Sequence, residues 1–404
     1  MSQPLVSETT PSAVGEWRPG ALKLLLVGQF AIFGLVLGVQ GVVWAEVMVA
    51  LSLSEGVFGT AQFTLPLVGF VVLLFNGQLY LRLGNKRQSI LSLLLLASAM
   101  LVLAAADHLW GLVVSLMLAG AGFAMLDAAT NSAGIDLEQA TGQHVMNVLH
   151  GISSGGVMLG AFLTGILLEA GWTYSLILLL SALICVPFIL LTLPVRYPPA
   201  GQGESESADA AGGSFLRQAL FIMLAAICFM GSAAEAIATV WAVIYLRGLE
   251  APIAISGATF ALFNAAMLIG RFLNAPLVAR LGTRVSLLIS GIGITVAAAL
   301  LLLFSSISVA VVAFVLLGLA VAGVQPTVLS ASAPLARNSG AVAAAVMMSA
   351  YAALLVAPPV YGWAAEFTSL RLAMLLVGVC GFLTTWLAVA LAVRRAPEQQ
   401  LASS

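Results

Sequence analysis

The chain has 404 residues, of which 61% are hydrophobic and 8% are charged, and its formal net charge is -1. Soluble domains carry about 25% charged residues, so this composition excludes a soluble globular protein and indicates one that crosses a lipid bilayer many times. The sequence contains no basic cluster, which excludes nucleic acid as a partner.

Apolar runs of about 20 residues are long enough to cross a bilayer as helices. Six such runs are predicted in the first half of the chain, at 20–50, 56–80, 88–106, 109–134, 145–169 and 173–194. Six more are predicted in the second half, at 217–246, 254–278, 284–305, 308–333, 339–364 and 369–393. The expected fold is an all-α membrane protein with twelve transmembrane helices.

The segments outside these runs divide the chain into two bundles of six helices, 20–194 and 217–393. Residues 195–216 are rich in proline, glycine, serine and acidic residues, a composition typical of a flexible linker. Residues 1–19 and 394–404 are expected to be tails. No signal-peptide cleavage pattern precedes the first run, so it is expected to remain as a spanning helix.

Lysine and arginine placement predicts the orientation. If the N-terminus is cytoplasmic, twelve Lys and Arg residues lie in inner loops and tails, while only Arg247 and Arg371 lie outside. Because cytoplasmic loops are enriched in Lys and Arg, we expect both termini in the cytoplasm.

An acidic residue inside the fourth run is the strongest candidate for function. Asp127 lies in GAGFAMLDAATNSA, and helical spacing places Thr130 and Asn131 on its face. A carboxylate at this depth costs about 2.5 to 3.5 kcal/mol and is usually retained for function. We interpret Asp127 as a proton-coupling group and Asn131 as a substrate contact; the alternative is an acid that only bonds a neighbouring helix.

Two further acids lie in predicted spans. Glu235 shares a polar helix face with Ser232 and Thr239, so we assign Glu235 to proton coupling and Thr239 to substrate binding. Glu46 has two equal interpretations, a coupling acid in a cavity or a solvated helix end. Arg271 is the only basic residue predicted at similar depth. It is either a gating residue that reaches the cytoplasmic face or a substrate contact.

Uncharged and aromatic residues complete the predicted substrate site. Gln40 and Gln325 are candidates for hydrogen bonds to hydroxyl groups, although Gln325 is equally suited to bond another helix. Trp44 and Trp241 are candidate platforms for a sugar ring, with anchoring at the lipid interface as the alternative. His150 is a gating or proton-relay candidate, and an ordinary helix-start histidine is the competing interpretation.

The two halves repeat a short motif. LRLGNKR (residues 81–87) follows the second run and ARLGTR (residues 279–284) follows the eighth, at an offset of 198 residues. Repeats of this kind are typical of secondary transporters. The first copy resembles the G-x-x-x-D-R-x-G-x-[KR]-[RK] signature of the major facilitator superfamily, with Leu81 in place of the acid. The resemblance implies gating by Arg82, Arg87 and Arg280, whereas simple anchoring at the membrane surface is the alternative.

A closer resemblance is to the fucose-permease-like branch of bacterial inner-membrane proteins. Four segments carry it, namely LDAATN (126–131), LHGISSGG (149–156), EAIATVWAVIYLR (235–247) and PPVYGWAAE (358–366). The resemblance implies proton coupling through Glu46 and Asp127. Related chains often have an acid where this one has Val240, which indicates a changed substrate preference.

We therefore predict a monomeric, proton-coupled symporter of a small polar, sugar-like solute that works by alternating access. A proton-driven antiporter that exports a drug or metabolite is the main alternative, and a transporter-like receptor is another. An enzyme is disfavoured because no H-E-x-x-H, G-x-S-x-G or P-loop motif is found. We expect no cofactor and no metal, and the three cysteines fall in apolar runs as small hydrophobic residues.

Overall fold

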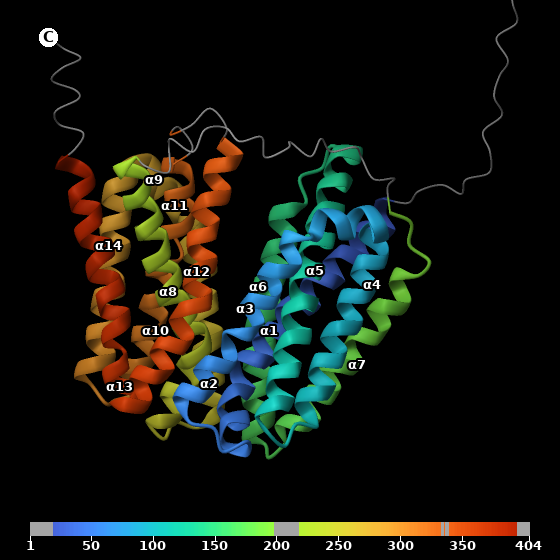
Figure 1. Ribbon diagram of the computed structural model, residues 1–404, viewed down its shortest axis with the longest axis horizontal. Coiled ribbons are helices and arrows are strands. Elements are labelled where there is room, and N and C mark those ends of the chain that lie inside the picture. Colours follow the sequence, from blue (N-terminus) through green and yellow to red (C-terminus); the bar gives the residue numbers. More distant parts are fainter. Residues whose placement is uncertain (1–18, 198–217, 333–334, 336–338, 394–404) are drawn as a thin grey trace, which may run out of the picture.

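The computed structural model describes residues 19–197, 218–332, 335 and 339–393, and these residues are almost entirely α-helical (Figure 1). The predicted tails and most of the predicted linker lie outside the described residues. The described chain contains eleven helical segments long and apolar enough to cross a membrane. One of them, α9 (Ile253–Leu303), has 51 residues and bends at Gly282, so it crosses twice and brings the number to the predicted twelve.

The N-terminal bundle contains six crossings. Its helices are α1 (Pro19–Ala50), α2 (Glu55–Gln62), α3 (Thr64–Leu74), α4 (Asn76–Ala104), α5 (Leu109–Thr141), α6 (Met146–Glu169) and α7 (Tyr174–Thr192). The second crossing is formed by α2, α3 and the start of α4, because α4 bends at Gly84. The predicted run 56–80 is therefore interrupted at Phe63 and Phe75, which its predominantly apolar composition did not indicate.

The C-terminal bundle repeats this plan. Its helices after α9 are α10 (Ile307–Val321), α11 (Val324–Ser332), α12 (Ser339–Phe367), α13 (Leu370–Ala373) and α14 (Leu375–Val393), and α8 (Ala219–Gly248) precedes α9. The repeated loop motif has the same backbone in both halves. Gly84 has φ 68° and ψ 167°, and Gly282 has φ 78° and ψ 165°. Glycine adopts this left-handed region without the steric penalty of other residues, so the motif fixes the same sharp turn twice.

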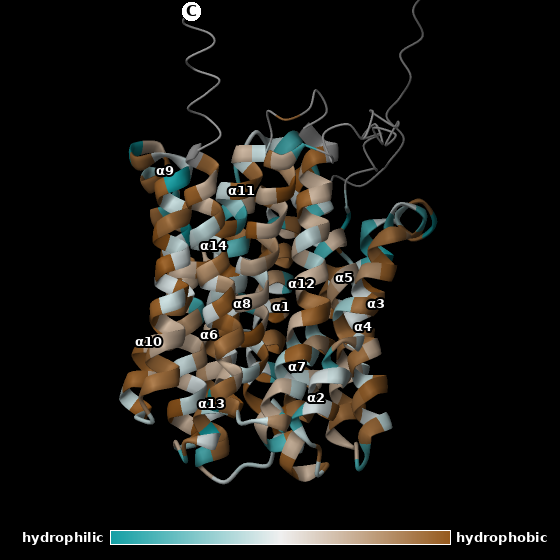
Figure 2. Cartoon of the chain, turned by 60° about the vertical axis from the view of Figure 1, so that its left-hand side comes forward, coloured by the Kyte–Doolittle hydropathy of each residue, from teal (hydrophilic) through white to brown (hydrophobic). Residues whose placement is uncertain are grey.

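Small residues allow the helices to pack closely. A side chain at Gly156 or Gly160 of α6 would collide with the backbone of α1, at Ala31 and Leu35 respectively. Gly165 of α6 also faces Gly257 of α9, in the other bundle, where a Cβ would lie 3.2 Å from the Cα of Gly257. Hydrophobic residues cover the sides of the molecule, and hydrophilic residues gather at its two ends, as a membrane protein requires (Figure 2).

The two ends of the molecule differ. We call the end at which α1 and α8 begin and α7 and α14 finish the linker end, and the opposite end the far end. The two bundles meet at the far end and separate toward the linker end (Figure 1).

Candidate functional site

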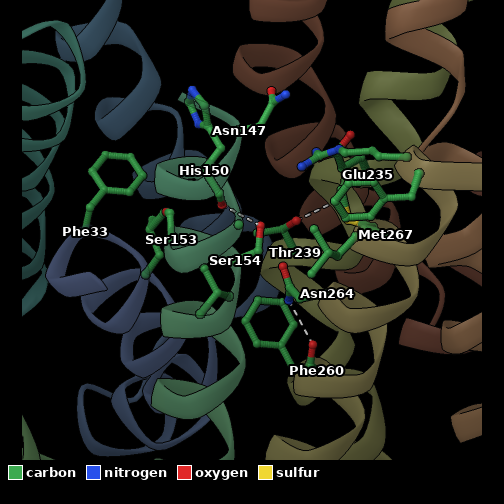
Figure 3. Close-up of a pocket in the computed structure, with 16 residues that line it drawn as sticks. Phe33, Asn147, His150, Ser153, Ser154, Glu235, Thr239, Phe260, Asn264 and Met267 are labelled. Atoms are coloured by element: carbon green, nitrogen blue, oxygen red, sulfur yellow. Dashed lines mark hydrogen bonds and ion pairs between the residues drawn. The ribbon is translucent and has the colours of Figure 1, made fainter. Parts of the chain in front are cut away.

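A cavity of about 630 Å³ lies between the two bundles. Its walls come from α1 and α6 of the N-terminal bundle and from α8 and α9 of the C-terminal bundle (Figure 3). The polar side chains that line it are Asn147, His150, Ser153, Ser154, Glu235, Thr239, Asn264 and Arg271. Phe33 and Phe260 contribute aromatic faces to the same walls. A cavity shared by two halves is where secondary transporters hold their substrates.

The C-terminal wall contains an ion pair. Nη2 of Arg271 in α9 lies 3.7 Å from Oε1 of Glu235 in α8. Both side chains are partly exposed, at 50% and 28% respectively. The Thr239 hydroxyl also lines the cavity and donates to the backbone oxygen of Glu235 over 2.9 Å. The structure thus brings three of the predicted residues together, and Arg271 faces the cavity.

The N-terminal wall is a polar face of α6. His150 lines the cavity, and its ring packs edge-on against Phe30 with the centroids 5.2 Å apart. The Ser154 hydroxyl donates to the backbone oxygen of His150 over 3.1 Å. Asn147 lies one helical turn before His150 and was missed from the sequence, as was Asn264 in the opposite wall. For Asn147, the signal was the periodic polar face that it forms with His150 and Ser154 in an apolar helix.

Asp127 lies beside this cavity and is absent from its immediate lining. It is half-buried, and its Oδ1 accepts a hydrogen bond from Asn131 Nδ2 over 2.8 Å. The Thr130 hydroxyl donates instead to the backbone oxygen of Leu126. His150 and Tyr351 lie near enough to interact with the charge of Asp127. Since Tyr351 belongs to α12 of the other bundle, Asp127 lies on the side of α5 that faces the other half.

Glu46 lies at the far end. Its Oε1 is 3.8 Å from Nη2 of Arg247, and both side chains are partly exposed. The pair lines a second hollow, of about 620 Å³, together with Glu169 and Tyr174. This geometry favours the interpretation of Glu46 as a hydrated helix end that pairs with the opposite bundle.

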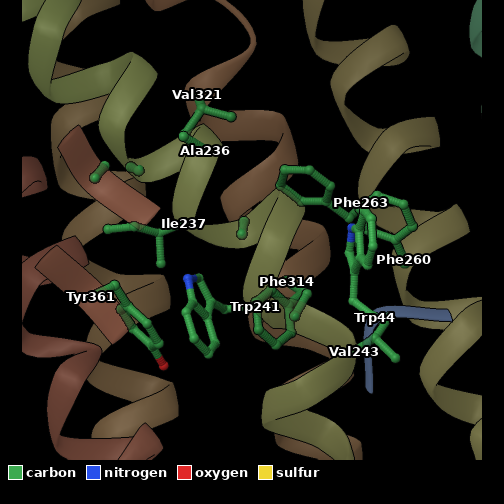
Figure 4. Packing of buried hydrophobic residues seen from close by; sticks show 14 of the residues in the cluster. Trp44, Ala236, Ile237, Trp241, Val243, Phe260, Phe263, Phe314, Val321 and Tyr361 are labelled. Atoms are coloured by element: carbon green, nitrogen blue, oxygen red, sulfur yellow. The ribbon is translucent and has the colours of Figure 1, made fainter. Parts of the chain in front are cut away.

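The two predicted tryptophans lie outside the cavity in this conformation. Trp241 is fully buried, 5.6 Å from Phe58 and 5.0 Å from Tyr361 between ring centroids, and Trp44 packs on Phe58 at 5.9 Å. Figure 4 shows Trp241 and Tyr361 inside the packed core. Both tryptophans therefore hold the closed far end together, and they contact neither the cavity nor the lipid interface.

The two predicted glutamines are also outside the cavity lining. Gln40 is buried one helical turn from Trp44, and its Nε2 has no hydrogen-bond partner within the described residues. Gln325 donates through Nε2 to Sδ of Met347 over 2.9 Å, so it bonds another helix of its own bundle.

The predicted gating arginines Arg82, Arg87 and Arg280 are exposed at the linker end. Between described residues, no hydrogen bond or ion pair joins them to the opposite bundle. Asn85 of the same loop donates to Ser132 and Asp136 of α5, and so ties the loop to its own bundle. The gating contact expected from the sequence is therefore open in this conformation.

Two carboxylates close the far end, and neither was predicted. Oε2 of Glu366 in α12 accepts hydrogen bonds from Ser54 Oγ over 2.6 Å and from Gly56 N over 2.8 Å, at the start of α2. Oε2 of Glu169 in α6 accepts one from Ala254 N over 3.3 Å, at the start of α9. Each bundle thus places an acid on a helix N-terminus of the other bundle, where negative charge is favoured. Their spacing of 197 residues is one short of the 198-residue repeat of the loop motif and is a signal that the sequence offered.

Comparison with known proteins agrees with this architecture. The family model described as Major Facilitator Superfamily matches residues 25–358. Membrane protein MosC of Rhizobium meliloti is 26% identical over 355 residues, which cover 87% of this chain and 86% of MosC. The uncharacterized transporter y4wD of Sinorhizobium fredii is 26% identical over 367 residues, with 89% of this chain and 95% of y4wD covered.

Solved structures show the same fold at low sequence identity. A mutant of the nucleoside transporter NupG has a TM-score of 0.79 and 14% identity, and the match covers 92% of this chain and 99% of that one. A bacterial homolog of the human lysosomal transporter Spinster, in an inward-facing and unoccupied conformation, has a TM-score of 0.70 and 15% identity, with 92% and 96% covered.

Proposed function

Because the chain belongs to the Major Facilitator Superfamily, we propose that it is a secondary active transporter that carries a small polar, sugar-like solute together with protons. The observation that carries this proposal is the cavity between the two bundles, whose walls combine amide, hydroxyl and charged side chains with aromatic faces. One chain forms both walls, so a monomer is sufficient for transport.

The proposed cycle is alternating access. We assign the linker end to the cytoplasmic side of a bacterial inner membrane, an orientation that the excess of Lys and Arg at this end supports. In the conformation observed, the far end is closed by Glu366, Glu169 and the aromatic cluster, so the cavity communicates with the cytoplasmic side. Opening to the outside requires these contacts to break while the bundles rock toward each other at the linker end.

Proton coupling is assigned to Asp127 and Glu235, with Glu46 in a secondary position. Asp127 and Glu235 lie in opposite bundles, beside the cavity and in its wall respectively, where a carboxyl group must be protonated, hydrated or paired with a cation. Glu46 lies apart from the cavity in this conformation, because it pairs with Arg247 at the far end.

A proton-driven exporter would use the same acids in the opposite sense. The burial of Trp44 and Trp241 outside the cavity weighs against a hydrophobic drug as its cargo. We also propose that the chain belongs to the fucose-permease-like branch. This proposal rests only on the four sequence segments quoted above, because MosC and NupG are not described as fucose permeases.

The test uses the purified protein in liposomes with a pH-sensitive dye inside. A solute that is added outside the liposomes and carries protons into them identifies symport. A solute whose entry drives protons out of the liposomes identifies exchange. Asp127→Asn should abolish accumulation driven by a pH gradient but retain solute counterflow, because exchange of bound solutes needs no release of the proton. Asp136→Asn, in the same helix but bonded to Asn85 at the linker end, is the matched control. Full accumulation by the Asp127 variant contradicts the coupling assignment.

A further inference from the structure

Arg271 has hydrogen-bonding capacity that the protein does not use. Its guanidinium carries five N–H donors in a rigid fork. Among the described residues, its one charged contact is with Glu235, 3.7 Å away, and it donates no hydrogen bond to any of them. Half of the side chain is exposed, in a wall of the cavity. A guanidinium fork aimed into a cavity matches the two oxygens of a carboxylate.

We propose that the transported solute is a hydroxylated monocarboxylate, such as a sugar acid, whose carboxylate binds Arg271 in competition with Glu235. The inference rests on the transport function proposed above and names the substrate class of the same cavity. When Glu235 takes up a proton it loses its charge, and Arg271 is released to bind the solute. The proton bound by Glu235 and the monoanion bound by Arg271 then cross together and their charges cancel, independently of any proton that Asp127 carries.

The charges around the cavity set this stoichiometry. Its titratable lining consists of His150, Glu235 and Arg271. Of the other helices packed on α8 and α9, α1 contributes Phe33 and Leu37 to the lining, while α10, α11 and α14 carry no acidic or basic side chain in their described parts. The charged residues of α12 and α13, Glu366 and Arg371, lie at the far end, away from the cavity lining.

Two further ionisable groups near the coupling acids do not change the charge of the site. Cys228 in α8 lies close to Glu235, and Tyr351 in α12 lies close to Asp127; neither adds charge near neutral pH. With Glu235 protonated, His150 neutral and Asp127 unchanged beside the cavity, one monoanion at Arg271 restores the net charge that the lining had before Glu235 took up its proton. A phosphate ester, at about -1.5 to -2 near pH 7, would leave excess negative charge in this site, whereas a carboxylate balances it.

The rest of the lining suits hydroxyl groups. Asn147 and Ser154 face the cavity from α6, and Asn264 faces it from α9. Asn264 donates to the backbone oxygen of Phe260 over 2.8 Å, so its side-chain oxygen is oriented to accept from a ligand. The Phe260 ring lines the wall beside it, where the apolar face of a sugar ring can pack.

The experiment compares matched acid and neutral ligands on the full-length protein. D-glucuronate, D-galacturonate and D-gluconate are tested against glucose, galactose and glucuronamide, by binding to detergent-purified protein and by uptake into liposomes. At least one acid should bind, and its neutral counterpart should bind about 10- to 100-fold more weakly, the factor expected for loss of a hydrogen bond to a charged group. Preference for the neutral ligands, or binding of none of the acids, overturns the proposal.

Variants separate Arg271 from Glu235. Arg271→Gln should lose acid binding, and Arg271→Lys should recover part of it because the charge remains without the fork. Wild-type affinity for the acid should rise as the pH is lowered from about 8 to about 5, a range in which a sugar acid stays ionised. Glu235→Gln should bind tightly at both pH values. The comparison is made in a His150→Gln background, because a histidine can gain charge between about pH 8 and about pH 5. Pronounced pH dependence that remains in Glu235→Gln in this background contradicts the competition.

The double variant Glu235→Gln/Arg271→Gln controls for folding, because it removes both charges and leaves neither unpaired. It should fold as well as the wild type and bind no acid; acid binding by a folded double variant contradicts the role of Arg271. The outcomes also distinguish this inference from the function on which it rests. Proton-coupled uptake of a neutral sugar supports the transport function and overturns the anion inference, whereas binding of an acid at Arg271 without any uptake supports the anion site and overturns the transport function.

Discussion

Removal of the Glu366 carboxylate should open the far end of the molecule. The carboxylate bridges the two bundles through hydrogen bonds of 2.6 Å and 2.8 Å, from Ser54 Oγ and Gly56 N. A hydrogen bond to a buried charged group contributes about 1.5 to 3 kcal/mol. Glu366 is exposed, so screening by solvent reduces each bond to about 0.5 to 1 kcal/mol. Glu366→Ala should therefore weaken the closed far end by about 1 to 2 kcal/mol, which shifts the equilibrium toward its open form about 5- to 30-fold.

Glu169→Ala is the matched comparison. Glu169 makes one hydrogen bond across the same interface, at 3.3 Å, so the shift should be about twofold. Spin labels at Asp107→Cys and Ser306→Cys, exposed positions at the far end of opposite bundles, report the distance between the bundles by pulsed electron paramagnetic resonance. The population at long distance should rank Glu366→Ala above Glu169→Ala above wild type. Equal populations in all three, or a larger shift in the Glu169 variant, would refute the reasoning.

Glycine substitutions test the packing and the repeated turn. Gly160→Leu should lower the free energy of unfolding of the purified protein by about 1 to 3 kcal/mol, because a Cβ there meets the backbone oxygen of Leu35 at 2.3 Å. Gly155→Ala should leave the free energy of unfolding unchanged, because a Cβ there meets nothing within 4 Å. Gly84→Ala should cost about 1 kcal/mol because its φ is positive, whereas Gly77→Ala, with equal free space and a helical backbone, should not destabilise. Equal melting temperatures within either pair would contradict the corresponding account.

The crossings and the repeat could be predicted because local chemistry determines them. Bilayer thickness requires about 20 apolar residues per helix, and a sharp left-handed turn requires glycine, as at Gly84 and Gly282. The interruptions at Phe63 and Phe75 were missed because a count of apolar residues passes over Pro66 and Asn76, which lie near them. Pro66 has no N–H to donate to the backbone oxygen of Gln62, so the helix is broken there.

The site was predicted less completely, since periodicity places residues on a face but does not identify what that face meets. The stripe of Glu235 and Thr239 was recognised, and the structure adds Arg271 as its partner. Trp241 was assigned to the substrate from its residue type, yet neighbours from α2 and α12 bury it completely. Only the three-dimensional arrangement distinguishes a ring that lines a cavity from one that closes the end of it.

The internal repeat places equivalent carboxylate contacts from both bundles at the closed far end, and it places no acid in the two repeated loops at the open linker end. Glu169 and Glu366 are 197 residues apart, and the helices they bond begin at Ile253 and Glu55, 198 residues apart, so each bundle holds the other by the same device. A rocking motion about the axis that relates the halves must break both sets of bonds together, and their costs add. At the linker end, the first loop has Leu81 at the position where the superfamily signature has an acid. The second loop has Ala279 at the equivalent position.

Because neither loop position has an acid, these loops offer no carboxylate that could hold the linker end closed as Glu169 and Glu366 hold the far end closed. This imbalance favours the conformation observed, in which the gating arginines have no partner in the opposite bundle among the described residues. It follows that Leu81→Asp, which restores the acid in one loop, should raise the population with a closed linker end and lengthen the distance between labels at Asp107→Cys and Ser306→Cys. A shorter or unchanged distance would show that the far-end bonds, and not the missing acid, determine the resting conformation.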